Sequence, residues 1–157
     1  MKKFYIKIVF LVCIILLSLN QVYATDIIGK GTTTMKYDRF AYSEIKITTE
    51  FHEDGIFERF SKGIYIARGK KAEYKFIEKS KWYIEDGYLY SEILDSHLED
   101  LTGDSSLIEF IKLYYVEGVK VGGTNRNKIL ELNSNKLILL IEYEDGNTDR
   151  VVLTKMN

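Results

Sequence analysis

The chain has 157 residues, of which 22 are basic and 23 acidic, and its formal net charge is −1. A chain of this length can build one hydrophobic core, so we expect a single domain. The near-neutral charge argues against nucleic acid, and against an anionic membrane surface, as the main partner.

The N-terminus has the pattern of a secretory signal peptide. Lysines at positions 2, 3 and 7 precede an apolar run over 8–17. This run is too short to span a bilayer comfortably, since that needs roughly 20 residues. Val22-Tyr23-Ala24 then resembles a small-residue cleavage site. We therefore expect residues 1–24 to be removed, the mature protein to begin at Thr25, and its location to be periplasmic or extracellular.

Cys13 raises one alternative, a lipoprotein in which this residue becomes the lipidated N-terminus. Val12 precedes it, where a lipoprotein cleavage site would carry a small residue, and further apolar residues follow. We therefore interpret Cys13 as an ordinary apolar residue of the signal peptide.

The mature chain, residues 25–157, is expected to be one domain with no transmembrane segment. Loss of the three signal-peptide lysines leaves 22 less 3, or 19, basic residues against 23 acidic ones, a net charge of about −4. The only Cys is lost with the signal peptide, and the chain contains no proline. Stability is therefore expected to come from sheet closure and apolar packing rather than from disulfides.

Three copies of Glu-Asp-Gly, at 53–55, 85–87 and 144–146, separate runs in which apolar and polar residues alternate. Asp-Gly is a strong hairpin signal, because a tight primed turn needs positive φ and glycine adopts it at little cost. Alternation, as over 45–51, is typical of a half-buried strand. The three turns therefore predict a succession of antiparallel strands.

The expected strands are 29–37, 45–51, 56–60, 64–67, 72–76, 81–85, 88–93, 128–132, 136–143 and 150–155. Gly63 is expected to form a bulge or bend. The polar, acidic stretch 95–104 is expected to break the strand pattern. A short helix is expected over 105–115, capped by Asp104 or Ser105, because its apolar residues fall on one helical face. The glycine-containing stretch 117–127 is interpreted as a loop or a loose edge hairpin.

These elements predict an all-β fold, an up-and-down antiparallel β-barrel of about eight to ten strands with one short helix. Closure into a barrel removes exposed strand edges, and a barrel of about eight strands can hold one small ligand. A single open sheet packed on the helix is the second possibility, and a Greek-key sandwich is the third.

Three segments resemble parts of the lipocalin-like, calycin-type domains of small secreted bacterial proteins. Residues 51–57 look like their F-x-x-D-G-x-F hairpin, 81–89 are similar to their x-W-x-I-x-D-G-x-L hairpin, and 129–155 resemble their closing strands. The resemblance implies an up-and-down barrel over residues 25–157 that holds a small ligand. It offers no catalytic residues.

No catalytic residue, metal site or cofactor is predicted, and we expect the protein not to be an enzyme. His52 sits beside two acidic residues at a hairpin, and His97 lies in the acidic stretch, so weak metal sites are conceivable. The spacing of the acidic stretch matches no Ca²⁺ loop, and solvated loops are the simpler interpretation. A carboxylate pair for glycoside hydrolysis is formally open, but nothing in the sequence singles one out.

Trp82 is the best single candidate for lining a ligand site. It offers the largest apolar surface, precedes a tight hairpin, and could present its indole N–H to a ligand's polar end. The companions expected to bind the ligand with it are Tyr74, Phe76, Tyr88 and Tyr90. Alternation places Trp82 and Tyr83 on opposite faces, but a one-residue register slip exchanges the faces. The competing interpretation is that Trp82 plugs the barrel end and the aromatic residues form its core.

Three classes of function follow. The first is a secreted or periplasmic carrier or sensor that holds a small apolar or amphipathic ligand in a mostly apolar cavity. The second is a protein-interaction module of the cell envelope, such as an inhibitor or immunity-type partner of a secreted enzyme, with a filled barrel and a conspicuous outer patch. The third is an envelope hydrolase, which needs converging carboxylates in a cleft. We expect them in this order.

Overall fold

The computed structural model describes residues 26–38, 42–143 and 146–156. The expected signal peptide and its cleavage site lie outside these residues. The strands and the helix are, in chain order, β1 (Gly29–Asp38), β2 (Tyr42–Phe51), β3 (Ile56–Ala67), β4 (Lys70–Glu85), β5 (Tyr88–Gly103), α2 (Ser105–Gly118), β6 (Thr124–Leu132), β7 (Lys136–Glu142) and β8 (Thr148–Lys155). In the described part of the chain, no helix is long and apolar enough to cross a membrane.

The strands form a closed barrel in the order β1 to β8, and every neighbouring pair is antiparallel. The contact that closes it is short: among the described residues, the β1–β8 register consists of Gly31 with Lys155 and Thr32 with Thr154. The prediction of an all-β, up-and-down barrel with one short helix is confirmed. The open sheet and the Greek-key sandwich are excluded.

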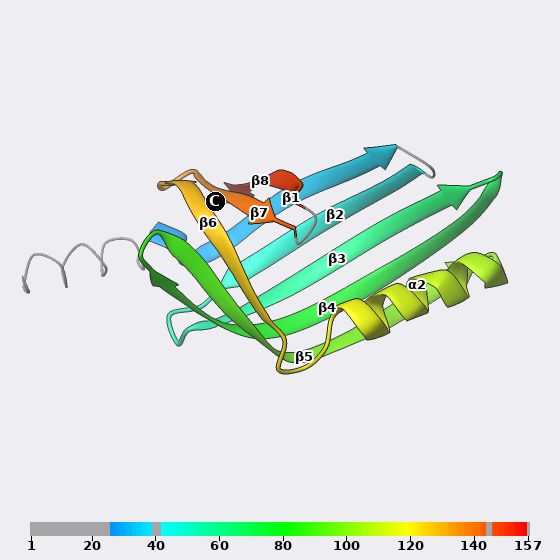
Figure 1. Ribbon diagram of the computed structural model, residues 1–157, viewed down its shortest axis with the longest axis horizontal. Coiled ribbons are helices and arrows are strands. Elements are labelled where there is room, and N and C mark those ends of the chain that lie inside the picture. The colour runs from blue at the N-terminus through cyan, green and yellow to red at the C-terminus, as the bar shows by residue number, and fades with distance from the viewer. Residues whose placement is uncertain (1–25, 39–41, 144–145, 157) are drawn as a thin grey trace, which may run out of the picture.

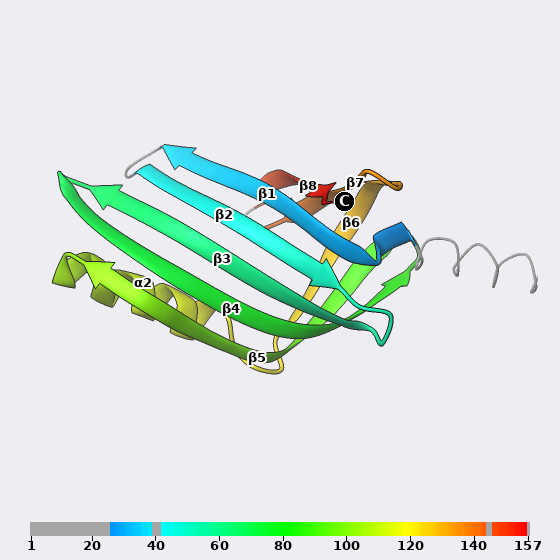
Figure 2. The same cartoon turned by 180° about the vertical axis from the view of Figure 1, so that it is seen from behind.

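The strands differ greatly in length. β4 and β5 have 16 residues each, whereas β6, β7 and β8 have 9, 7 and 8. β5 pairs with β6 only over Tyr88–Glu92, so β1–β5 continue as a curved sheet beyond the three short strands (Figures 1 and 2). We call the part completed by β6–β8 the closed end. We call the part beyond it, where α2 packs against β4 and β5, the extended end.

The predicted hairpins at 53–55 and 85–87 are confirmed. Gly55 has φ +78°, and Asp86 and Gly87 have φ +50° and +77°, so the second hairpin has a two-residue turn with both central residues at positive φ. At the third turn only Gly146 is described, with φ +81°, and its N–H donates to the Tyr143 carbonyl. Glycine suits positions 55, 87 and 146 because most side chains resist positive φ, whereas aspartate tolerates it at Asp86.

The acidic stretch 95–104 does not break the strand pattern, and that prediction was wrong. Residues up to Gly103 belong to β5, which pairs with β4 through two register shifts. These shifts keep the polar side chains of Asp95, His97 and Glu99 outside while Leu98 points to the core, so these residues need no loop to stay in solvent.

Gly63 is not a bulge, and here too the prediction was wrong. β3 is continuous, and Gly63 pairs in register with Ile45 of β2 and Tyr74 of β4. A Cβ at Gly63 would lie 2.1 Å from the Tyr74 ring carbon Cζ. Glycine therefore leaves room for the tyrosine ring, which crosses the neighbouring strand.

The predicted helix is confirmed, with Asp104 as its N-cap. The Asp104 carboxylate accepts hydrogen bonds from the backbone N–H groups of Ser106 and Leu107 at 3.0 and 3.4 Å. The helix ends later than expected, at Gly118, and β6 begins earlier, at Thr124, because Thr124 to Lys128 pair with β5. The expected loop over 117–127 is therefore shortened to 119–123.

Two apolar clusters fill the inner face. The cluster of the closed end contains Ile27, Phe51, Phe57, Trp82, Leu89, Leu137, Leu139, Val151 and Leu153. The cluster of the extended end contains Ala72, Tyr74, Phe76, Leu107 and Ile111, the last two from α2. Burial of these side chains supplies most of the favourable free energy of folding.

Candidate functional site

Trp82 lies inside the closed end and is only 8% exposed. Its ring meets Phe51 edge to face at a centroid distance of 5.5 Å, and Phe51 in turn contacts Phe57 at 5.4 Å. The indole Nε1–H donates to the Ile56 carbonyl at 3.0 Å. The polar group that was expected to meet a ligand is therefore occupied by the backbone.

Tyr74 and Phe76 also point inward, but they lie at the extended end under α2. The Tyr115 ring stacks on Phe76 with centroids 4.5 Å apart, and the Tyr115 hydroxyl donates to the Tyr74 hydroxyl at 2.8 Å. Burial raises the pKa of both tyrosines, that of Tyr115 far above its ordinary value. Both hydroxyls therefore stay protonated, and the pair ties the helix to the sheet.

A polar group of side chains separates the two apolar clusters. Glu78 is 3% exposed and accepts hydrogen bonds from Arg59 Nη1 at 3.1 Å and from Ser80 Oγ at 2.8 Å. The Arg59 guanidinium also lies 5.2 Å from the Phe57 ring centroid. A buried carboxylate must be paired in this way, because an isolated buried charge is very costly.

Tyr88 and Tyr90 lie on the opposite, outer face of the sheet. Tyr83 and Tyr90 stack across β4 and β5 with ring centroids 4.8 Å apart and planes 3° from parallel. Tyr88 contacts Tyr90 at 6.4 Å, and the Arg126 guanidinium of β6 lies 4.5 Å from the Tyr88 ring centroid. We call Tyr83, Tyr88, Tyr90 and Arg126 the tyrosine patch.

The five residues predicted to line a ligand site are therefore divided among three places. Trp82 lies in one cluster, Tyr74 and Phe76 lie in the other, and Tyr88 and Tyr90 lie outside. Their ligand-binding role stays a prediction. A two-residue turn at 86–87 pairs Tyr83 with Tyr90, so the two residues lie on the same face of the sheet. Since Trp82 lies on the other face, this register could have predicted from the sequence that Tyr88 and Tyr90 lie opposite Trp82.

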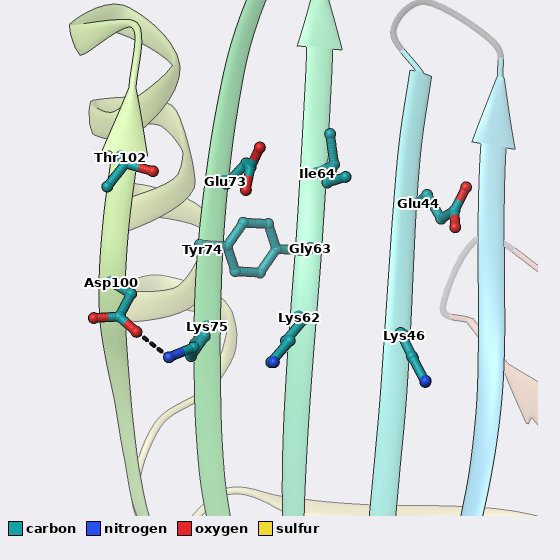
Figure 3. Close-up of a pocket in the computed structure, with 10 residues that line it drawn as sticks. All are labelled: Glu44, Lys46, Lys62, Gly63, Ile64, Glu73, Tyr74, Lys75, Asp100 and Thr102. Atoms are coloured by element: carbon teal, nitrogen blue, oxygen red, sulfur yellow. Dashed lines mark hydrogen bonds and ion pairs between the residues drawn. The ribbon is translucent and has the colours of Figure 1, made fainter.

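A hollow of about 420 Å³ lies on the outer face of the extended end (Figure 3). It is lined by Glu44, Lys46, Lys62, Gly63, Ile64, Glu73, Tyr74, Lys75, Asp100 and Thr102. The hydrogen bond from the Tyr42 hydroxyl is the main cause that lowers the pKa of Glu44, and the hydrogen bond from the Lys36 ammonium is the second. The hydrogen bond to Asp100 raises the pKa of Lys75. Both shifts favour the charged forms of Glu44 and Lys75. Of the five residues predicted from the sequence to line a ligand site, Tyr74 alone borders this hollow.

His97 lies among acidic side chains. His97 is exposed on the outer face, with Nε2 3.3 Å from Glu99 Oε1 and Nδ1 4.0 Å from Asp95 Oδ2. Within the described ranges, no three His, Cys, Asp or Glu side chains are grouped so that they could hold a metal ion.

No protein-family model matches the chain, and no curated protein matches it. A solved structure described as a lipocalin-like protein from Bacteroides uniformis is similar over 83% of this chain and 99% of its own, with 15% sequence identity and a TM-score of 0.42.

Proposed function

We propose that the protein is an exported, non-enzymatic binding protein that recognises a protein partner through the tyrosine patch. The observation that carries the proposal is the stack of the exposed Tyr83 on the half-buried Tyr90, beside Tyr88 and Arg126. Tyr83 is 55% exposed. Tyrosine and arginine are the residue types enriched at the energetic centres of protein interfaces.

The geometry of the patch favours binding. The stacking and cation–π contacts already hold the aromatic rings in place, so little side-chain entropy is lost when a partner docks. The patch sits on the paired strands β4, β5 and β6, which form a rigid support. Its tyrosine hydroxyls can exchange hydrogen bonds with water for hydrogen bonds with a partner.

The other parts of the proposal have separate support. Export is supported by the lysines, apolar run and cleavage pattern of residues 1–24. A non-enzymatic role is supported by the state of Glu78, whose carboxylate is engaged by Arg59 and Ser80 rather than free to act on a substrate. The packed aromatic residues of the barrel interior favour recognition on the outside.

The experiment that tests the proposal is quantitative capture from the exported fraction of the native host. Tyr83→Ala and Arg126→Ala variants are compared with the wild type, each with its melting temperature measured. Tyr114→Ala is the matched control, because Tyr114 is an exposed tyrosine on α2, outside the patch. We expect both patch variants to bind the captured protein at least tenfold more weakly, with a melting temperature lowered by no more than about 4 °C. A partner that is retained equally by all variants would refute this role for the patch.

A small apolar or amphipathic ligand inside the barrel is the second candidate. The observation in its favour is that Trp82, Tyr74 and Phe76 all face inward from β4. Such a ligand would have to displace packed side chains, since Trp82 already bonds to Ile56 and Tyr74 to Tyr115. Native mass spectrometry of protein purified from its host separates the candidates, because a retained small molecule would favour this one.

A further inference from the structure

Three lysines form a row across the outer face of the extended end. The strand register places Lys46 of β2 opposite Lys62 of β3, and Lys62 opposite Lys75 of β4. Figure 3 shows the three side chains at one level of the sheet. Like charges directly opposite one another destabilise a sheet, so this row is costly for the free protein.

The carboxylates of the hollow do not neutralise the centre of this row. Each has its own cation: Glu44 pairs with Lys36 at 3.2 Å, Glu73 pairs with Lys71 at 2.6 Å, and Asp100 pairs with Lys75. Lys46 and Lys62 form no ion pair with any residue in the described part of the chain. Lys46 and Lys62, which are register partners on neighbouring strands, are therefore left for an anion from outside.

The hollow also offers contacts beyond the two ammonium groups. Its volume of about 420 Å³ lies within the range of roughly 300–1,000 Å³ that is usual for small-molecule sites. About two residues along the strands from the lysine row, the lining contains the carboxylates of Glu44 and Glu73 and the hydroxyl of Thr102. These oxygens can accept hydrogen bonds from hydroxyl groups. The negative charge of the two carboxylates repels a second anionic group.

We propose that this hollow binds a small soluble anion that also carries hydroxyl groups, of the sugar phosphate class. The flexible side chains of Lys46 and Lys62 turn toward the phosphate and bind it from neighbouring strands, and the hydroxyls of the sugar donate to Glu44, Glu73 and Thr102. This site lies at the other end of the molecule from the tyrosine patch and is independent of the protein partner.

The test is an amide NMR titration of the full mature chain with glucose 6-phosphate, inorganic phosphate and glucose, at low ionic strength. The test variant is the double substitution Lys46→Gln and Lys62→Gln. The control is Lys79→Gln with Lys81→Gln, which removes the same charge from exposed lysines of β4. We expect glucose 6-phosphate to bind more tightly than phosphate and to shift residues around 44–46, 62–64 and 73–75. We expect the test variant to lose at least tenfold in affinity and the control less than twofold.

A second measurement separates binding from a structural role. Without ligand, removal of the lysine repulsion should raise the melting temperature by about 1–3 °C, so the variant would be more stable yet fail to bind. Equal losses in both variants, no saturable binding, or glucose 6-phosphate no tighter than phosphate would overturn the proposal. Binding to phosphatidylglycerol vesicles that depends on Lys46 and Lys62, without binding of the soluble sugar phosphate, would overturn the assignment to a soluble ligand.

Discussion

The two ends of the barrel bury the same face of one sheet in different ways. At the closed end β6–β8 curve back to β1, so strands cover strands and enclose Phe51, Phe57 and Trp82. At the extended end β4 and β5 continue without these partners, and α2 supplies the cover through Leu107 and Ile111. A barrel can therefore outgrow its shortest strands when a helix takes over the apolar face they leave open.

The two ends should also differ in local stability. The closed end is cross-linked by strand pairing on both sides of the core, whereas α2 rests on the sheet by one face and leaves Phe110, Leu113 and Tyr114 exposed. Regions with fewer buried contacts open at lower free energy than the core. The comparison thus predicts that α2 detaches before the closed end unfolds.

The largest expected effect tests the core of the closed end. Trp82→Ala removes the ring that packs on Phe51 and the hydrogen bond to Ile56, and should lower the free energy of unfolding by about 3–5 kcal/mol. Denaturant unfolding measures it. Tyr83→Ala, the neighbouring position on the outer face, is the control and should cost less than about 1 kcal/mol. Similar losses for the two variants would show that the closed end does not depend on a tryptophan core.

A smaller effect is expected where the ring of Tyr74 crosses β3. Gly63→Ala places a Cβ inside the space of that ring and should cost about 1–3 kcal/mol. The control is Gly31→Ala, where the new Cβ would meet Leu153 Cβ at 3.4 Å, and it should cost less than about 1 kcal/mol. Combining Gly63→Ala with Tyr74→Ala should cost less than the sum of the two, and strict additivity would contradict the clash.

The smallest effect concerns the start of α2. The hydrogen bond from the Ser106 hydroxyl is the main cause that lowers the pKa of Asp104 to about 2. Because this value lies below the unfolded pKa of about 3.9, the ionised cap stabilises the folded state above that pH, and the contribution is lost as the pH falls from about 4 towards 2. Amide protection factors of 107–111 should fall over this window more than that of Leu139 at the closed end.

Asp104→Asn is the matched control for the pH dependence, since an amide oxygen can still cap the helix but does not titrate. The fall in protection over the same window should be smaller in this variant. An identical fall in both proteins would assign the pH dependence to other carboxylates.

Much of the fold followed from local chemistry. The hairpins at 53–55 and 85–87 rest on glycines with positive φ, and the cap at Asp104 rests on its own side chain. The continuity of β5 through its acidic half could not be predicted from local chemistry, because it depends on register shifts against β4. The role of Gly63 depends on Tyr74 of the next strand, which no local pattern reveals.

The sites were harder to predict than the fold. The roles of the inward aromatic residues depend on where β6–β8 end. Trp82 and Tyr74 lie on one face of β4, but Trp82 belongs to the cluster of the closed end and Tyr74 to the cluster of the extended end. The lysine row was accessible in principle, because the turns at 53–55 and 68–69 fix the register that aligns Lys46, Lys62 and Lys75. Recognising it required pairing across three strands rather than inspection of each strand alone.

The unequal strand lengths have a consequence for self-association. Beyond Glu92, β5 has no strand partner on its far side, and β1 pairs with β8 only at Gly31 and Thr32 among the described residues. Such open edges can recruit strands from another copy and start aggregation. β5 counters this with two register shifts, charged residues such as Asp95 and Asp100, and a hydrogen bond from Ser96 to Val119 at the end of α2. Because Val119 caps the helix that covers the core, the end of α2 is thereby tied to this edge strand.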